Sequence, residues 1–247
     1  MLILNNLTKK YGKSEGNALD SFSLILPRGE IVGIFGENGA GKTTMMKSVL
    51  NLHSFEGEVT LDGEVVGNSN ITKLSFATCE HSFFSNINGE AHREFYASHF
   101  PNFREKRFAR LMEFFELPMN KKISKFSTGQ QNQFEVILAL CQGADYIFMD
   151  EPFAGNDIFN REDFYKVLLG ILEERETVIL STHLIDEVEH FIGRAVLMSK
   201  GKVIDDCTSE GFEEVGLANY IKARYQYQSD RVSRALDSLS EQEEETS

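Results

Sequence analysis

The first third of the chain reads as strands separated by turns. Between Leu19 and Leu26 apolar and polar residues alternate, as expected when one face of a strand is buried. The dipeptide Asp62-Gly63, flanked by two further apolar-polar runs, favours a tight hairpin turn. The strand candidates in this part are Leu2–Leu4, Leu19–Leu26, Glu30–Phe35, Glu58–Leu61, Glu64–Val66 and Leu74–Thr78.

The pattern changes to a helical period between about residues 87 and 125. Aromatic residues recur there at helical spacing, and Pro101 and Pro118 punctuate the segment. Helices and strands then alternate, in the order Gln130–Cys141, Tyr146–Met149, Asn160–Glu173 and Thr177–Ser181. Such alternation predicts a mostly parallel sheet. We expect an α/β fold with an antiparallel β subdomain and an α-helical subdomain inserted at about residues 82–140.

A glycine-rich sequence follows the apolar run Ile31–Phe35 and opens a helix-compatible segment that reaches Leu50. It fits Gly-x-x-x-x-Gly-Lys-Thr, the loop that binds nucleotide phosphates, in the strand–loop–helix context that supports this reading over a surface turn. Glycines let backbone N–H groups surround a polyphosphate, and the helix dipole points at the same phosphates. Lys42 is expected to reach the β- and γ-phosphates, and Thr43 to ligate Mg²⁺. The expected contacts are Gly36, Glu37, Asn38, Gly39, Ala40, Gly41, Lys42, Thr43 and Thr44. The sequence therefore predicts a P-loop NTPase core that binds a nucleoside triphosphate.

Composition narrows the possible partners. The chain has 247 residues, enough for one large α/β core, and a net charge of −13, which argues against nucleic acid as the main partner. Cys79, Cys141 and Cys207 are widely spaced and match neither a zinc site nor a disulfide framework, which fits a reducing cytoplasm. Residues 226–247 form an acidic tail that we expect to be poorly ordered.

The phosphate loop alone fits kinases, small GTPases, strand-exchange ATPases and transport ATPases, and downstream residues distinguish these classes. Asp150 ends a predicted buried strand, where a Mg²⁺-coordinating carboxylate belongs, and Glu151 suits a general base that orients water. Ser127 precedes a helix and has two readings, an anion-binding terminus or a simple N-cap. His183 lies just past a strand at the ligand-binding edge of the sheet, although a lone histidine there is usually structural or solvated.

In combination these motifs resemble the nucleotide-binding subunit of an ABC transporter, and the likeness extends to about residue 210. The resemblance implies that Tyr11 stacks on adenine and that Glu151 polarises the attacking water, with His183 holding water and γ-phosphate. It also implies a head-to-tail pair of subunits, in which ATP on one phosphate loop is capped by the partner's signature motif. The signature residues carried over are Ser127, Gly129 and Gln130.

Four departures from the family pattern are present. Glu80 replaces the usual Gln before the helical subdomain; it is expected to approach Mg²⁺ through oxygen but cannot donate as an amide does. Phe126 and Thr128 replace residues of the signature, and Thr128 requires a negative φ there. Gln133 stands where an Arg is common. The segment 153–157 keeps the Gly and Asp of the family's Asp-bearing loop but not its usual Leu.

The resemblance implies an ATPase subunit that drives a separate integral-membrane permease from the cytoplasmic face of the membrane. We expect ATP and Mg²⁺ as ligands, a second ABC ATPase subunit as partner, and export of peptides, antimicrobials or drugs. The compact length and Glu80 resemble subunits of bacterial exporters, and this resemblance implies the export direction. The alternative is a soluble ABC ATPase that assists iron–sulfur cluster assembly.

Overall fold

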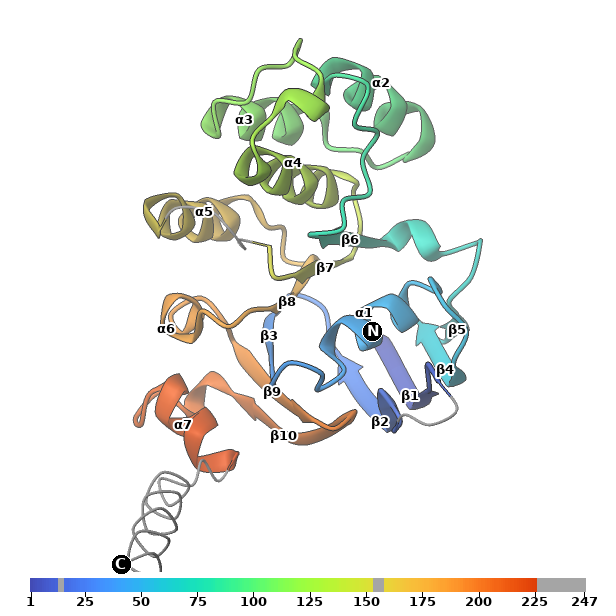
Figure 1. The fold of residues 1–247 in the computed structure, drawn as a ribbon, viewed down its shortest axis with the longest axis vertical. Helices are drawn as coiled ribbons and strands as arrows, with labels where there is room; N and C mark the ends of the chain where they lie inside the picture. Colours follow the sequence, from blue (N-terminus) through green and yellow to red (C-terminus); the bar gives the residue numbers. More distant parts are fainter. Residues whose placement is uncertain (13–15, 153–157, 226–247) are drawn as a thin grey trace, which may run out of the picture.

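The computed structural model describes residues 1–12, 16–152 and 158–225, which form two sheets and a group of helices (Figure 1). The smaller sheet is antiparallel and has the order β2-β1-β4-β5. Asp62 and Gly63 have φ values of 54° and 87°, so both central residues of the β4–β5 turn are left-handed, as the predicted hairpin requires. The strands are β1 Leu2–Lys9, β2 Leu19–Leu26, β4 Glu56–Leu61 and β5 Glu64–Val65.

The larger sheet has six strands in the order β10-β9-β3-β8-β7-β6. All its neighbours are parallel except the edge pair β9 and β10. The carboxyl ends of β3, β7 and β8 therefore meet at one edge of the sheet, where open α/β folds bind their ligands. The strands are β3 Ile31–Phe35, β6 Leu74–Thr78, β7 Tyr146–Asp150, β8 Thr177–Ser181, β9 Arg194–Ser199 and β10 Lys202–Thr208.

Helices divide between the sheet and a separate layer. Helices α2, α3 and α4 lie between β6 and β7 in the sequence and group together at the top of Figure 1. Phe108 and Phe134 are fully buried among them, with ring centroids 6.3 Å apart. The helices are α1 Lys42–Val49, α2 Gly89–His99, α3 Glu105–Phe114, α4 Thr128–Cys141, α5 Ile158–Ile171, α6 Ile185–Val188 and α7 Leu217–Arg224.

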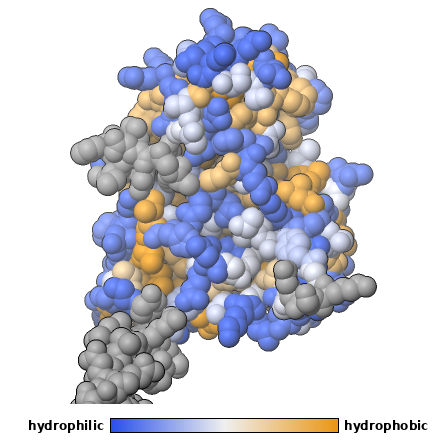
Figure 2. All heavy atoms as spheres, viewed as in Figure 1, coloured by the Kyte–Doolittle hydropathy of each residue, from blue (hydrophilic) through white to orange (hydrophobic). Residues whose placement is uncertain are grey.

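Two hydrophobic cores stabilise this arrangement. One joins the antiparallel sheet and α1 to one face of the large sheet, and includes Leu4, Met46 and Phe148. The other joins the helical layer, α5 and α7 to the large sheet, and includes Phe134 and Leu180. The face seen in Figure 2 is mostly polar, with hydrophobic residues in separate patches. Among the described residues, no helix combines the length and apolar character needed to cross a bilayer.

The expected α/β class with an antiparallel sheet and grouped helices is confirmed, while several element bounds differ from the prediction. The first strand continues past Leu4 to Lys9, because pairing with β2 and β4 on both sides sustains it through polar residues. The helix expected at Asn160–Glu173 begins and ends two residues earlier. Residues 226–247, expected to form an acidic tail, lie outside the described residues.

Candidate nucleotide-binding and hydrolysis site

The phosphate loop connects β3 to α1, as its sequence predicts. Two of its glycines are required by the backbone. Gly41, the residue before the helix, has φ of 105°, a conformation that a side chain would strain. At Gly36 an added Cβ would lie 2.5 Å from the carbonyl oxygen of Met198, so the loop packs directly against the end of β9.

Lys42 lies inside the loop rather than on its surface. The residue is 8% exposed, and its ammonium donates to the carbonyl oxygens of Gly36 at 2.7 Å and Glu37 at 3.3 Å. Burial lowers the pKa of this lysine, while the negative charges of Glu151 and Asp150 oppose the change. The cation therefore lies on the concave side of the loop, at the place where a phosphate would bind.

Asp150, the last residue of β7, brings the loop and the sheet together. Its Oδ2 accepts a hydrogen bond from Thr43 Oγ1 at 2.5 Å, and its Oδ1 accepts one from Ser181 Oγ. Ser181 lies opposite Asp150 in the β7–β8 register, so adjacent strand ends fix the carboxylate. One hydroxyl and one carboxylate, beside a bound triphosphate, are the kind of ligand set that Mg²⁺ uses, since it retains water and phosphate oxygens as other ligands. The residues present thus fit the ion.

Glu151 occupies a strained position directly after Asp150. Its φ is 48°, and its amide donates to the carbonyl of Ser181 at 3.0 Å, which holds the residue at the end of β8. Its Oε1 lies 3.2 Å from His183 Nε2, and is buried without a hydrogen bond among the described residues. Burial raises the pKa of this carboxyl, against the lowering effects of His183 and Lys42. An unsatisfied acceptor at this point is suited to a water molecule.

These groups line one open cleft of about 360 Å³. Tyr11, placed after β1, lies at the cleft with 58% of its surface exposed, so a ring face is available for stacking. The structure therefore brings together most residues that the sequence singles out. The cleft is lined by Tyr11, Ala18, Asn38, Gly39, Ala40, Gly41, Lys42, Thr43, Thr44, Asp150, Glu151 and His183.

Ser127 is not among the residues of that cleft. It caps the N-terminus of α4, where its hydroxyl accepts from the amide of Gln130 at 3.2 Å and its amide donates to the Gln130 side chain at 3.1 Å. Ser127 is exposed and Gly129 is partly exposed. Thr128 begins the helix and is not among the residues with positive φ, so its branched side chain is accommodated. Both readings of Ser127 remain compatible, since a cap that is exposed can also meet a ligand.

Glu80 lies on the loop after β6, away from the cleft. Its two carboxylate oxygens are each 2.8 Å from Lys47 Nζ, and its side chain is 71% exposed. Lys47 lies four residues after Thr43 on α1, about 6 Å further along the helix axis. The expected approach of Glu80 to Mg²⁺ thus requires the carboxylate to leave Lys47, and that role stays a prediction.

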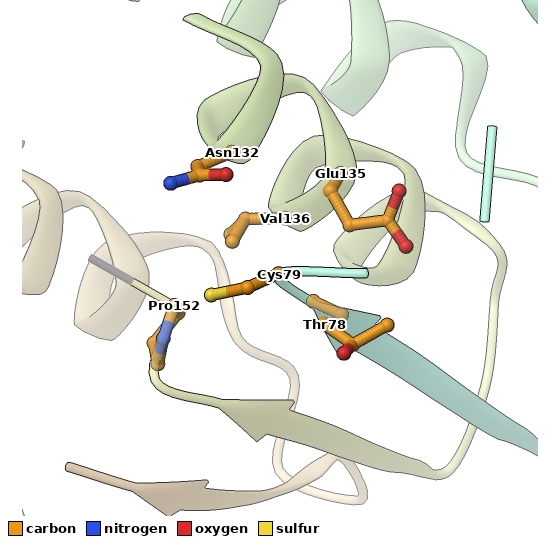
Figure 3. A pocket seen from close by; sticks show the side chains of 7 residues that line it. Thr78, Cys79, Asn132, Glu135, Val136 and Pro152 are labelled. Carbon is orange, nitrogen blue, oxygen red and sulfur yellow. The ribbon is translucent and has the colours of Figure 1, made fainter. Parts of the chain in front are cut away.

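Two buried side chains that the sequence did not single out hold the loop that follows Glu80. From α4, Glu135 accepts from the amide of Ser82 at 3.0 Å and from its hydroxyl at 2.6 Å. Figure 3 shows Glu135 and Asn132 projecting from α4 over Thr78 and Cys79 at the end of β6. From α2, His92 accepts from the amide of Phe84 at 3.1 Å. Residues 82–84 are therefore attached to the helical layer, and we call this arrangement the loop clamp.

The segment 153–157, which carries the expected Asp-bearing loop, lies outside the described residues. Ser181 and Glu135 are the functional additions that sequence reasoning missed. In the sequence, Ser181 is marked only as a polar residue that ends a predicted strand, and Glu135 only as a charged residue within an apolar helix. The sequence does not show that the strand of Ser181 lies beside that of Asp150.

Comparison with known proteins adds independent findings. A family model described as "ABC transporter" matches residues 19–154. The chain is similar to the ABC transporter ATP-binding protein NatA of Bacillus subtilis, with 26% identity over 83% of this chain and 88% of NatA. It is 30% identical to the aliphatic sulfonates import ATP-binding protein SsuB of Bacillus thuringiensis, over 79% of this chain and 80% of SsuB. A solved dimeric ATP-binding cassette in a post-hydrolysis state, bound to ADP and Pi, has 27% identity and a TM-score of 0.74, covering 86% of this chain and all of that one.

Proposed function

Since the chain belongs to the ABC transporter family and is an ABC ATPase subunit of a transporter, we propose that two such subunits close on ATP and thereby drive a bacterial exporter of peptides, antimicrobials or drugs. The proposal assigns one half of each ATP site to the cleft at Lys42 and the other half to Ser127 of a second subunit. The separation of Ser127 from the cleft within one chain is the observation that carries it.

In the first half-site, each group has a separate task. Lys42 exchanges the carbonyls of Gly36 and Glu37 for phosphate oxygens. Thr43 and Asp150 would hold Mg²⁺, which would offset negative charge on the phosphate oxygens. Tyr11 stacks on the adenine ring, and Asn38 with the loop amides surrounds the phosphates.

Hydrolysis follows from the position of Glu151. Its Oε1, which lies 3.2 Å from His183 Nε2, accepts a proton from water as the water oxygen bonds to the γ-phosphorus and the bond from that phosphorus to the β,γ-bridging oxygen breaks. Burial of the carboxyl raises its pKa, against the lowering effects of His183 and Lys42, and so improves it as a base. His183 Nε2, 3.2 Å away, orients the water and the γ-phosphate. ADP and phosphate then leave as the two subunits reopen.

In the second half-site, Ser127 and Gly129 of one subunit contact the γ-phosphate bound by the other. The exposed end of a 14-residue helix offers both hydroxyl and amide donors there. Gln130 supports this end through the capping box. The helical layer, with exposed Phe84 beside it, contacts the permease and transmits the motion. This places the subunit at the cytoplasmic face of the membrane.

Export is the finer part of the proposal. It rests on the resemblance of Glu80 and of the compact chain to bacterial exporter subunits. SsuB, an import protein by its name, supports the opposite direction. Recovery from detergent-solubilised membranes with a multi-span protein, followed by flux assays in vesicles, measures both points. Recovery with a soluble scaffold instead contradicts the transport role.

The two-subunit site is tested in a Glu151→Gln background. That change removes the base and should slow hydrolysis by on the order of a hundredfold or more while ATP binding persists. Mg-ATP should then convert the subunit to a dimer in size-exclusion chromatography. Adding Ser127→Glu should abolish the dimer, because a carboxylate would face the γ-phosphate.

A matched control is Ser98→Glu, which adds the same charge to an exposed serine of α2. It should leave both the dimer and the Kd for ATP unchanged. A Ser127→Glu protein that dimerises as well as the Ser98→Glu protein contradicts the shared site. Loss of ATP binding by the monomer would contradict the separation of the two half-sites.

A further inference from the structure

Tyr11 is held by hydrogen bonds that reach into the phosphate-loop helix. Its phenolic oxygen lies 3.3 Å from His53 Nδ1 and 3.4 Å from Thr44 Oγ1. The His53 ring meets the tyrosine ring edge-on, with centroids 5.7 Å apart and planes at 89°. His53 follows α1, so this helix and the loop after it both contact a tyrosine that lies at least 33 residues earlier in the sequence.

The partners of His53 determine which of its nitrogens carries the proton. Ser48 Oγ donates its proton to the carbonyl of Thr44 at 2.8 Å, so it can only accept from His53 Nε2, 2.9 Å away. The ring is therefore protonated at Nε2, and Nδ1 has a lone pair that can accept the one proton of the tyrosine hydroxyl, for which Thr44 Oγ1 at 3.4 Å is the second acceptor. Burial, followed by the charges of Lys9 and Lys47, lowers the pKa of His53 and favours this neutral form.

Lys9 contributes a second constraint. Its ammonium lies 5.1 Å from the centroid of the Tyr11 ring and donates to the carbonyl of Ser54 at 2.6 Å. The tyrosine is thus fixed at its hydroxyl by His53 and against its ring by Lys9, although the residue is 58% exposed. A large exposed side chain that both contacts hold in one orientation is preorganised for binding a ligand.

We propose that His53 is a positioning residue for nucleotide binding, which fixes the Tyr11 ring in the orientation that stacks on the purine of ATP. This inference rests on the proposed adenine contact of Tyr11. The histidine is itself held through Ser48, whose hydroxyl donates to the carbonyl of Thr44 on α1. His53 touches neither base nor phosphate and acts only through Tyr11.

The test compares the Kd for Mg-ATP with the Kd for inorganic triphosphate, measured by calorimetry on the full-length subunit carrying Glu151→Gln. His53→Leu removes the acceptor and should weaken ATP binding about three- to tenfold, because the tyrosine must then be ordered on binding. Triphosphate has no base, so its Kd should stay constant. Tyr11→Phe keeps the ring and removes the hydroxyl, and should weaken ATP binding by a similar factor.

The double variant His53→Leu/Tyr11→Phe should bind ATP no more weakly than Tyr11→Phe alone, because Tyr11→Phe already removes the hydrogen bond to His53. His99→Leu changes an exposed histidine of α2 and serves as the control, with both Kd values unchanged. Equal weakening of ATP and triphosphate by His53→Leu would mean that the residue only supports α1, and overturns the inference.

The variant Tyr11→Ala tests the stacking role of Tyr11 separately from the positioning role of His53. If that variant binds ATP as well as the parent, the stacking role of Tyr11 is itself wrong. If Tyr11→Ala weakens ATP binding while His53→Leu does not, the stacking role stands and only the role of His53 is overturned.

Discussion

At the scale of single residues, Glu80 is one of the four departures from the family pattern that the sequence indicates. A carboxylate in place of an amide gains a partner that an amide could not hold equally well, the ammonium of Lys47 at 2.8 Å. Lys47 is on the same face of α1 as Thr43. The Glu80 carboxylate therefore has two possible cationic partners along one helix, Lys47 and the Mg²⁺ expected at Thr43.

Glu80→Gln tests which cation matters for turnover. If the position only supplies an oxygen toward Mg²⁺, the variant should retain ATPase activity within about threefold, because an exposed ion pair contributes little to stability. The measurement is steady-state phosphate release, with Lys47→Gln as the control that removes the same ion pair from the other side. An inactive Glu80→Gln protein beside an active Lys47→Gln protein would show that the charge of Glu80 itself is required.

At the scale of elements, the loop clamp makes residues 82–84 part of the helical layer. Glu135 and His92 are 2% and 0% exposed and come from α4 and α2. Amide hydrogens at Ser82 and Phe84 point into that layer, and the preceding residue, His81, has a φ of 55°. Rotation of the helical layer against the sheet is therefore expected to bend the chain at residues 79–81, which include Glu80.

The clamp predicts a pH dependence of stability. His92 Nδ1 donates to the carbonyl of Asn88 at 2.8 Å, so Nε2 must be unprotonated to accept from Phe84. Burial lowers the pKa of His92, which means that the unfolded chain binds more protons below the ordinary value of 6.5. The free energy of unfolding should thus decrease as pH falls below 6.5, by at most about 1.4 kcal/mol per pH unit from this group.

Urea unfolding of the wild type and of His92→Gln between pH 5 and 8 measures that slope. The groups facing His92 are the rings of Phe83, Phe84 and Phe134, which do not titrate, and Glu135 binds the same loop in both proteins. The difference in slope therefore belongs to His92, and it should vanish above about pH 7. Identical slopes for the two proteins would contradict the assigned protonation.

At the scale of the whole molecule, one arginine joins the two sheets. Arg28 Nη2 lies 2.7 Å from Asp62 in the β4–β5 turn and 2.8 Å from Asp145, just before β7. Asp145 is nearly buried and also pairs with Arg175 at 2.7 Å. The hydrogen bond from Arg28 lowers the pKa of Asp62 to about 2, so this carboxylate keeps its charge at a lower pH than a free aspartate does.

Arg28→Met should therefore lower the free energy of unfolding by roughly 1–3 kcal/mol, because Asp145 keeps only one of its two cationic partners in a buried position. Thermal and urea unfolding measure the effect. Lys202→Met, which breaks the exposed pair with Asp20, should change stability by about 0.5 kcal/mol or less. Equal losses in both variants would contradict a role for Arg28 in joining the sheets.

The sequence pattern predicts those features of the fold and of the site that depend on residues close together in the chain. Asp62-Gly63 and the spacing from Gly36 to Thr43 are local, and both features are found as predicted. The contact of Asp150 with Ser181 depends on β8 lying beside β7, an order that alternation of helices and strands leaves open. The link from Tyr11 to His53 is less accessible still, because it joins loops after β1 and after α1 through tertiary packing alone.

The position of Lys42 has a kinetic consequence. Because its ammonium already bridges two carbonyls across the loop, capture of a triphosphate exchanges oxygen partners at a lysine that is held in place beforehand. Association should then proceed at the rate of diffusional encounter, with a weak dependence on temperature, and differences in affinity among nucleotides should be expressed in how long each resides.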